Sequence, residues 1–411
     1  MNAIGIAGRK GETVRSDCWV SIELTDSGGI QLDLKSRVAF LYADSIRQLV
    51  QDELTALGVT NARVQLEDSG AVPFVIMARV EAAVRRARPD AQLPEFLPEP
   101  GPSFARPTTR DRWRRSRLYL PGNEPKFMLN ARIHQPDGVI LDIEDSVPPE
   151  EKDAALILVR NALIAVDFGE CERMVRINQL PRGLDELAPL VKAGVNVILI
   201  PKCEDDSQVT AVAERISAIQ QEFNLKHDVF LMPIVETCQG MFQAHRIAAA
   251  AKRVVALTYG MEDYIADLAA TKTPAGLESL WARSQIVNAA RAAGVQPIDT
   301  VFADVSDLAG LEASCLAAKE LGFEGKGCIH PRQIRVVNNA FTPSASEIER
   351  ACQIYAAFRI AEQQGKSVAV IGSKMIDPPV VRRARRTIEL AIAAGKLSPD
   401  WHATFPPDKE V

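Results

Sequence analysis

Short apolar runs rich in β-branched residues alternate with segments of helical periodicity between residues 116 and 331. We predict eight of these runs as β-strands, and almost every one ends in a polar or charged residue: 116–121, 138–144, 173–178, 196–202, 229–236, 254–260, 297–302 and 327–331. Four of the intervals are predicted as helices: 210–223, 244–251, 278–293 and 307–321. This alternation predicts an α/β protein with a parallel sheet, and eight such units predict a closed (β/α)8 barrel, the TIM-barrel architecture.

The C-terminal ends of the strands are the place where such barrels carry their chemistry. The predicted ends supply side chains that can bind or react: Asn123, Glu144, Arg176, Lys202, Glu236, Asp263 and His330. This ring of groups predicts an enzyme.

Residues 87–111 contain six prolines and little periodicity, so we predict an extended, semi-rigid linker between a domain at 1–86 and a barrel domain at 112–341. In the first domain, alternating residues 19–24 and 30–34 around a Ser-Gly-Gly turn predict a β-hairpin. A helix at 38–57, a second alternating pair around Asp68-Ser69-Gly70 and a short helix at 80–84 complete a small α+β domain.

Residues 342–411 form a predicted C-terminal helical extension with helices at 346–363 and 379–394. Ser344 and Glu347 have the spacing of a capping box for the first of these helices. The segment between the helices is predicted as an extended loop, because Pro378 steers the preceding residue, Asp377, away from helix. Such a loop can deliver Asp377 to a specific place.

The bulk composition narrows the classes of partner. A net charge of −5 and a pI near 5.7 give no reason to expect nucleic acid. No apolar run approaches the ~20 residues that a membrane span needs. The first residues lack the basic-then-apolar pattern of a signal peptide, so we expect a cytoplasmic location.

Two acidic residues follow neighbouring predicted strands. Glu236 ends the fifth strand and Asp263 lies just past the sixth, so a barrel brings their carboxylates together. Two carboxylates with water ligands suit Mg²⁺ or Mn²⁺. The alternative is two solvated loop acids.

Basic residues at the other strand ends have two interpretations each. Arg176 can bind a substrate carboxylate or pair with Glu144 on the adjacent strand, and both can hold at once. Lys202 can form a Schiff base, although a ligand-facing ammonium is favoured beside a metal-type pair. Lys326, within Gly-Lys-Gly, offers a cation and backbone N–H groups to a phosphate. His330 is assigned to binding or to a capped turn.

Several of these segments resemble a known family: 115–123, 139–146, 175–178, 234–237, 259–263 and 326–331. They resemble the citrate lyase beta chain and its relatives, the malyl-CoA and citramalyl-CoA lyases of the HpcH/HpaI aldolase superfamily, over residues 113–390. The resemblance implies that Glu236 and Asp263 hold Mg²⁺, that Arg176 and Glu236 bind the substrate, and that Glu144 orients Arg176. It also implies that Asp377 is the catalytic acid and reaches the site of a neighbouring subunit.

The first 90 or so residues resemble the acyl-carrier (gamma) chain of citrate lyase, through residues 68–72 and 78–84 and Arg15-Ser16-Asp17. In that family a serine two places before the matching aspartate carries a phosphoribosyl-dephospho-coenzyme A arm. Arg15 occupies that place here and Ser16 is adjacent, so Ser16 is the candidate attachment site.

The resemblance implies Mg²⁺-dependent retro-Claisen cleavage of a 3-hydroxyacyl thioester, with citryl thioester giving oxaloacetate and acetyl thioester. The substrate would be an acyl-CoA or acyl-carrier thioester. Implied partners are further copies of the chain, in a trimer or hexamer, and a citrate lyase alpha (transferase) chain. Two alternatives stay open: a malyl-CoA or citramalyl-CoA lyase with a vestigial carrier domain, and a non-catalytic homologue that binds acyl thioesters.

Overall fold

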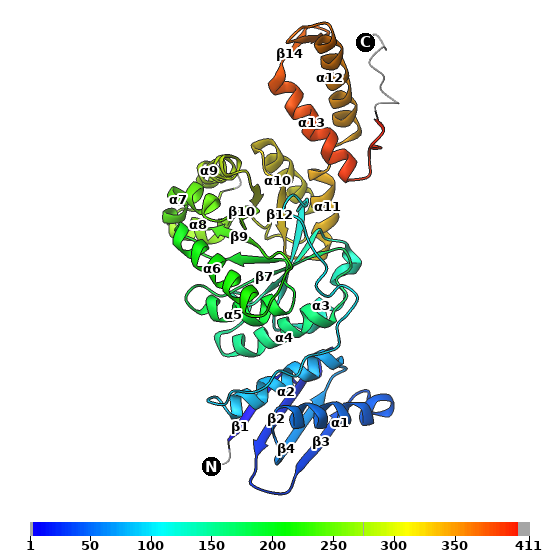
Figure 1. Cartoon of the computed structure of the whole chain (residues 1–411), viewed down its shortest axis with the longest axis vertical. Coiled ribbons are helices and arrows are strands. Elements are labelled where there is room, and N and C mark those ends of the chain that lie inside the picture. Colours follow the sequence, from blue (N-terminus) through cyan, green and yellow to red (C-terminus); the bar gives the residue numbers. More distant parts are fainter. Residues whose placement is uncertain (1–2, 274, 402–411) are drawn as a thin grey trace. The chain divides into compact units, whose positions relative to one another are not determined.

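The computed structural model describes residues 3–273 and 275–401. The chain divides into two compact units, one ending at Ile334 and the other beginning at Arg335. The first unit contains a four-stranded sheet followed by a closed barrel, and the second is a helical hairpin with a small β-ribbon (Figure 1).

The predicted eight-stranded parallel barrel is confirmed. Its strands pair in chain order and close between the first and the last: β5 (Ser116–Pro121), β6 (Gly138–Asp142), β7 (Glu172–Arg176), β8 (Val197–Ile200), β9 (Phe230–Val235), β10 (Ala256–Tyr259), β11 (Gln296–Asp299) and β12 (Gly325–Cys328). The helices that follow them are α3 (Pro125–Met128), α4 (Lys152–Ala165), α5 (Arg182–Lys192), α6 (Asp206–Glu222), α7 (Cys238–Ala249), α8 (Met261–Asp267), α9 (Leu277–Ala293), α10 (Leu308–Leu321) and α11 (Pro331–Phe341), with short 3₁₀ turns at Ala131–His134 and Pro149–Glu151.

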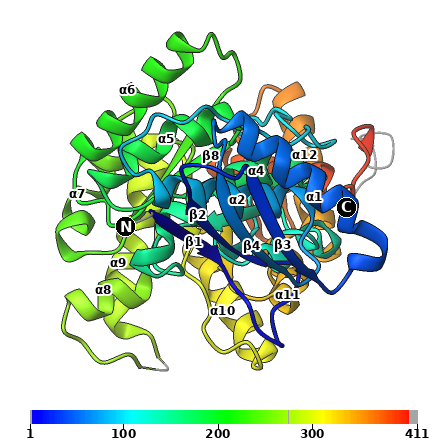
Figure 2. The same ribbon diagram turned by 90° about the horizontal axis from the view of Figure 1, so that it is seen from below.

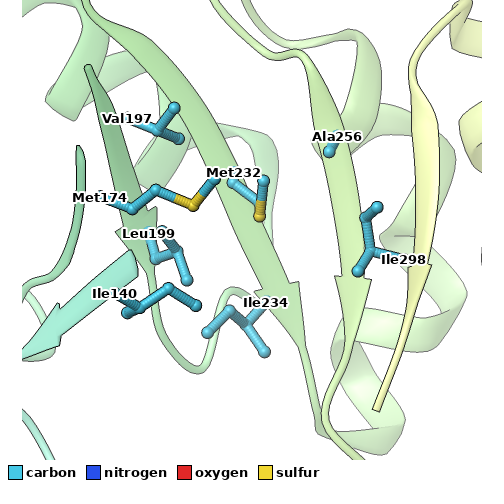
Figure 3. Close-up of a cluster of buried hydrophobic side chains, with 8 residues drawn as sticks. All are labelled: Ile140, Met174, Val197, Leu199, Met232, Ile234, Ala256 and Ile298. Carbon is cyan, nitrogen blue, oxygen red and sulfur yellow. The ribbon is translucent and has the colours of Figure 1, made fainter. Parts of the chain in front are cut away.

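The barrel interior is packed with apolar side chains from successive strands, as Figure 3 shows: Ile140, Met174, Val197, Leu199, Met232, Ile234, Ala256 and Ile298. All are almost completely buried. Strands covered on both faces are expected to be continuous apolar runs, which is why the sequence pattern located them within a few residues. The last strand, β12, begins at Gly325, two residues before the predicted start, and ends at Cys328, three residues before the predicted end.

The small N-terminal sheet has the strand order β1 (Ile4–Gly8), β2 (Cys18–Leu24), β4 (Ala62–Asp68) and β3 (Ile30–Ser36) (Figure 2). The predicted hairpin between β2 and β3 is wrong, because β4 lies between them, antiparallel to β2 and parallel to β3. Helix α1 (Ala39–Ala56) provides the crossover and buries Val50 and Leu54. The predicted strand after Gly70 is also wrong: Pro73 begins helix α2 (Pro73–Ala87), where its missing N–H costs nothing.

The predicted linker has no regular structure, but it lies against the barrel. Ser103 is buried and its backbone oxygen accepts a hydrogen bond from Arg173 in β7. The backbone N–H of Gly101 donates to Ile164 at the end of α4. The segment therefore packs against the end of the barrel at which the strands begin.

Helix α2 joins the small sheet to the barrel, because it packs on β1 and β2 and also on α4. Glu81 on α2 is fully buried and accepts hydrogen bonds from both terminal nitrogens of Arg160 on α4. Beside this pair lies Glu53 of α1, which is also fully buried. Neither carboxyl oxygen of Glu53 has a hydrogen-bond partner within the described ranges.

The second unit contains α12 (Ala345–Gln363), the antiparallel pair β13 (Ala369–Ile371) and β14 (Lys374–Ile376), and α13 (Pro378–Ala393). The capping box of Ser344 and Glu347 is present, as predicted. The segment before Asp377 is a β-ribbon, not an open loop, and Asp377 itself is the N-cap of α13. Proline at the first helical position starts this helix instead of blocking it. Among the residues described, no helix has both the length and the apolar character of a membrane span.

The unpaired Glu53 generates a prediction about stability. Burial raises the pKa of Glu53 well above its usual value, and the neighbouring Glu81 adds to this effect. The folded protein then keeps a proton that the unfolded chain releases above about pH 4.3, so this residue makes the free energy of unfolding fall as pH rises. We expect Glu53→Gln to be more stable than the wild type at pH 8, with a difference that shrinks towards pH 4.5.

Urea unfolding at pH 5, 6.5 and 8 measures this difference. The matched control is Asp44→Asn, an exposed acid on the same helix, which should show no such trend. A Glu53→Gln protein that is less stable than the wild type at pH 8 would contradict the prediction.

Candidate active site

A cavity of about 330 Å³ opens among the C-terminal ends of the barrel strands. Residues directly after β9, β10 and β11 line it, together with the last residues of β5, β6 and β7. Three residues predicted for the site, Arg176, Glu236 and Asp263, all border this one cavity. Among the lining side chains that were not assigned from the sequence are Arg117, Tyr119, Asp142, Thr258 and Asp299.

Glu236 directly follows β9 and is 3% exposed. Its Oε1 accepts a hydrogen bond of 2.7 Å from the backbone N–H of Lys202. Its Oε2 lies so close to Gly260 that a Cβ there would meet it at 2.3 Å, so only glycine leaves room for the carboxyl group. Burial raises the pKa of Glu236 to about 7, and the charge of Asp263 adds to this, while the bond from Lys202 acts in the opposite direction.

Asp263 lies in the first turn of α8 and is partly exposed. Lys202 contacts both acids, since its Nζ is 3.6 Å from Oδ1 of Asp263 and its backbone holds Glu236. The donor set fits Mg²⁺, which is bound by few carboxylates and keeps several water ligands. No cluster of three or more His, Cys, Asp or Glu residues suited to a metal occurs in the part of the chain that the structure describes.

The side chain of Lys202 is surrounded by acids. Its Nζ is 3.7 Å from Glu144 and 3.9 Å from Asp145, in addition to Asp263. Burial lowers the pKa of Lys202, but the charges of Asp145, Glu144 and Asp263 together raise it above its usual value. Because a Schiff base requires the free amine, this environment favours the ligand-facing ammonium.

Arg176 ends β7 and is held mainly by Asp142. Its Nε and Nη2 donate to the two oxygens of Asp142 at 2.7 Å each. The predicted partner, Glu144, lies 3.1 Å from Nη1. The sequence analysis did not predict Asp142 as the residue that binds Arg176 with both oxygens, although Asp142 lies on the same strand face as Glu144. The edge of the guanidinium with Nε and Nη2 is therefore occupied by Asp142, while Nη1 faces Glu144 and, at 3.7 Å, Asp145.

The structure does not support the phosphate cradle predicted at Gly-Lys-Gly. These residues belong to β12, and the backbone N–H of Lys326 donates to Arg115 in the barrel sheet. Its Nζ is buried and lies 2.7 Å from Asp299, which also pairs with Arg283. His330 is half-buried, and its Nδ1 accepts a hydrogen bond from the backbone N–H of Arg332, as expected for a capped turn.

Ser16, the candidate attachment site, is half-buried in the segment before β2. The next residue, Asp17, is buried and accepts two hydrogen bonds of 2.9 Å from Arg79 on α2. Arg79 also donates to the backbone oxygen of Asn123, directly beyond β5. The segment that carries Ser16 is thus tied to the end of the barrel that holds the cavity. Asp377 belongs to the second unit, where its side chain accepts a hydrogen bond from the backbone N–H of Val380.

Comparisons with known proteins agree with the two parts of the first unit. Residues 115–331 match the family described as HpcH/HpaI aldolase/citrate lyase. Residues 9–87 match an acyl-carrier family described as malonate decarboxylase delta subunit (MdcD). These two matches confirm the resemblance seen in the barrel and the acyl-carrier likeness of the N-terminal domain.

Individual relatives match about two thirds of the chain. Citrate lyase subunit beta of Haemophilus influenzae is 38% identical over 281 residues, which are 68% of this chain and 97% of that protein. Mitochondrial citramalyl-CoA lyase of Homo sapiens is 33% identical over 290 residues, 68% of this chain and 85% of that protein. The crystal structure of the protein CitE from Mycobacterium tuberculosis in complex with magnesium, acetoacetate and coenzyme A has a TM-score of 0.57 and 29% identity, and the match covers 69% of this chain and 99% of that one.

The burial of Lys326 predicts a structural effect of its replacement. Lys326→Met removes one charged hydrogen-bond donor from buried Asp299, which keeps Arg283, so we expect the free energy of unfolding to fall by about 1.5–3 kcal/mol. Urea unfolding measures this loss. Lys252→Met, at an exposed barrel position, is the matched control and should change little. Unchanged stability of Lys326→Met, together with weakened binding of coenzyme A, would restore the phosphate role.

Proposed function

Because the chain belongs to the HpcH/HpaI aldolase/citrate lyase family, we propose that it is a carbon–carbon lyase that cleaves citryl thioester to oxaloacetate and acetyl thioester. The observation that carries the proposal is the convergence of Arg176, Glu236 and Asp263 on one cavity at the end of a barrel where chemistry is expected. The beta subunits of citrate lyase among its relatives support the choice of substrate.

Each residue has a part in the proposed reaction. Arg176, which borders the cavity and is oriented by Asp142 and Glu144, binds the carboxylate of the substrate beside its hydroxyl carbon. Glu236 and Asp263 would hold Mg²⁺, which supplies a Lewis acid for the hydroxyl and the oxo oxygen that replaces it. Gly260 and the N–H of Lys202 fix the carboxyl of Glu236, and the ammonium of Lys202 balances the local negative charge.

Cleavage transfers the bonding electrons to the thioester fragment. The hydroxyl gives its proton to a water molecule and becomes the oxo group of oxaloacetate, while the carbon–carbon bond breaks and leaves a thioester enolate. Asp377 donates a proton to the α-carbon of this enolate, which gives acetyl thioester. We infer from the position of Asp377 in a separate compact unit that it serves the site of a neighbouring subunit, so the active enzyme is a homo-oligomer.

The N-terminal domain would supply the thioester. Through Asp17, Arg79 and Asn123 the segment with Ser16 is tied to the end of the barrel with the cavity, which supports Ser16 as the attachment point of a phosphoribosyl-dephospho-coenzyme A arm. Intact-mass measurement of the protein from its native host tests the modification. The transferase partner and the cytoplasmic location stay predictions.

A cleavage assay tests the proposed function. Citryl-, malyl- and citramalyl-CoA are incubated with the protein, with Mg²⁺ or with EDTA, and the 2-oxo acid and any free thiol are measured. Oxaloacetate from citryl-CoA, without free thiol, is the expected result. Preference for malyl- or citramalyl-CoA, with no arm on Ser16, would identify the corresponding lyase with a vestigial carrier domain. If no thioester is cleaved, the remaining interpretation is a non-catalytic homologue that binds acyl thioesters.

Neutralising either acid should abolish the reaction without unfolding the protein. We expect Glu236→Gln or Asp263→Asn to lower kcat/KM by more than about 100-fold, since even residues that only orient metal ligands cost 10–100-fold. Mn²⁺ binding, followed by electron paramagnetic resonance, should be weakened in parallel. The control is Glu222→Gln, at an exposed position of α6. Wild-type activity of Asp263→Asn in limiting Mg²⁺ would remove Asp263 from the metal site.

Subunit exchange tests the role of Asp377. Asp377→Ala and Glu236→Gln proteins should each be inactive, whereas a mixture after exchange should regain part of the wild-type rate. A restored site takes its metal ligands from one parent and its acid from the other. If verified exchange returns no activity, Asp377 acts within its own chain or has no catalytic part.

A further inference from the structure

Arg117 is the second residue of β5 and lies deep in the barrel. It shares the inward face of this strand with Tyr119 and Pro121, and all three border the cavity. Its side chain has no exposed surface. Its neighbours include Met232, one of the apolar side chains in the barrel centre (Figure 3).

The guanidinium of Arg117 is poorly satisfied. Among the described residues, Nη1 donates to Sδ of Met232, at 3.2 Å, and to Oγ1 of Thr258, at 3.4 Å, and to no carboxylate. Nε and Nη2 have no hydrogen-bond partner among the described residues. Burial lowers the pKa of Arg117, but a guanidinium stays protonated in proteins, so a positive charge is held here.

Other buried arginines of the barrel show how unusual this is. Arg114 is bound by both oxygens of Glu172, and Arg176 by both oxygens of Asp142. The acid whose charge acts on Arg117, Asp299, is already paired with Lys326 and Arg283. A buried charge without a partner costs several kcal/mol, and an apolar residue of similar length would fill the space without that cost. The arginine is therefore explained by an anion that enters the cavity.

Arg117 and Arg176 lie at two depths of the same cavity. Arg117 precedes Tyr119 by two residues on one strand face, a separation of roughly 6–7 Å along the strand. The ring of Tyr119 lies 5.5 Å from Cζ of Arg176. A small ligand with an anionic group at each end can reach both guanidinium groups.

We propose that Arg117 binds a second carboxylate on the acid half of the substrate, so that the site selects a dicarboxylic 2-oxo acid over a monocarboxylic one. This inference rests on the proposed function and deepens it. The acid half of citryl thioester is oxaloacetate, which carries two carboxylates, whereas those of malyl and citramalyl thioester, glyoxylate and pyruvate, carry one. Arg117 thereby determines which thioester is cleaved.

Binding of oxaloacetate and pyruvate to the full chain, measured by calorimetry in Mg²⁺ buffer, tests the proposal without catalysis. The wild type should bind oxaloacetate more tightly. Arg117→Met should weaken the affinity for oxaloacetate by about tenfold or more, since a hydrogen-bonded charge is lost. Its affinity for pyruvate should change by less than about twofold. Its melting temperature should be equal to or above that of the wild type. Met232→Leu, which keeps the apolar contact, is the control and should retain the preference.

Each outcome decides a different question. If Arg117→Met weakens the binding of both acids equally, or changes the binding of neither, the role of Arg117 is overturned while the lyase proposal stands. A wild type that binds both acids equally would also overturn it, even if the variant does not fold. A wild type that binds neither acid would contradict the proposed function itself.

Discussion

A charge inside the apolar barrel is stable only when an opposite charge reaches it, because an ion that leaves water loses several kcal/mol of solvation. This constraint organises the end of the barrel that holds the cavity. Asp142 neutralises Arg176, and Asp299 neutralises Lys326. Glu236 accepts a hydrogen bond from one backbone N–H and keeps a raised pKa. Nε and Nη2 of Arg117 have no hydrogen-bond partner among the described residues. Glu236 and Arg117, whose charges the protein leaves incompletely balanced, are among the residues that we assign to the metal and the substrate.

The barrel could be predicted because its signal is local. Each strand is a short apolar run buried on both faces, so composition alone located it. The N-terminal sheet was predicted wrongly because its pairing is not local. A Ser-Gly-Gly turn between β2 and β3 is typical of a hairpin, yet β4, from more than 25 residues further along, lies between them. Nothing in the turn itself encodes that insertion.

The same distinction applies to the site. Arg176, Glu236 and Asp263 were predicted because a parallel barrel gathers its strand ends, whatever the details of packing. Asp142 and Arg117 lie two and four positions before the predicted ends of their strands, at 144 and 121, where only the alternation along β6 and β5 could reveal them. The prediction for Lys326 followed from the glycines beside it, since glycines beside a lysine are typical of a phosphate loop. Here the glycines allow β12 to pack closely against its neighbours. A Cβ atom at Gly325 would lie 2.1 Å from the backbone oxygen of Arg114.

The anchoring of the acyl-carrier-like domain has a kinetic consequence. Because α2 is bound to α4 by the buried pair of Glu81 and Arg160, the domain is held by its own barrel and does not sample the solution freely. A thioester carried on this domain would meet the cavity as an intramolecular reactant, at an effective concentration in the millimolar range that a short tether provides. Its rate of cleavage would then be independent of enzyme dilution for as long as the assembled site persists, whereas cleavage of free thioester would remain bimolecular.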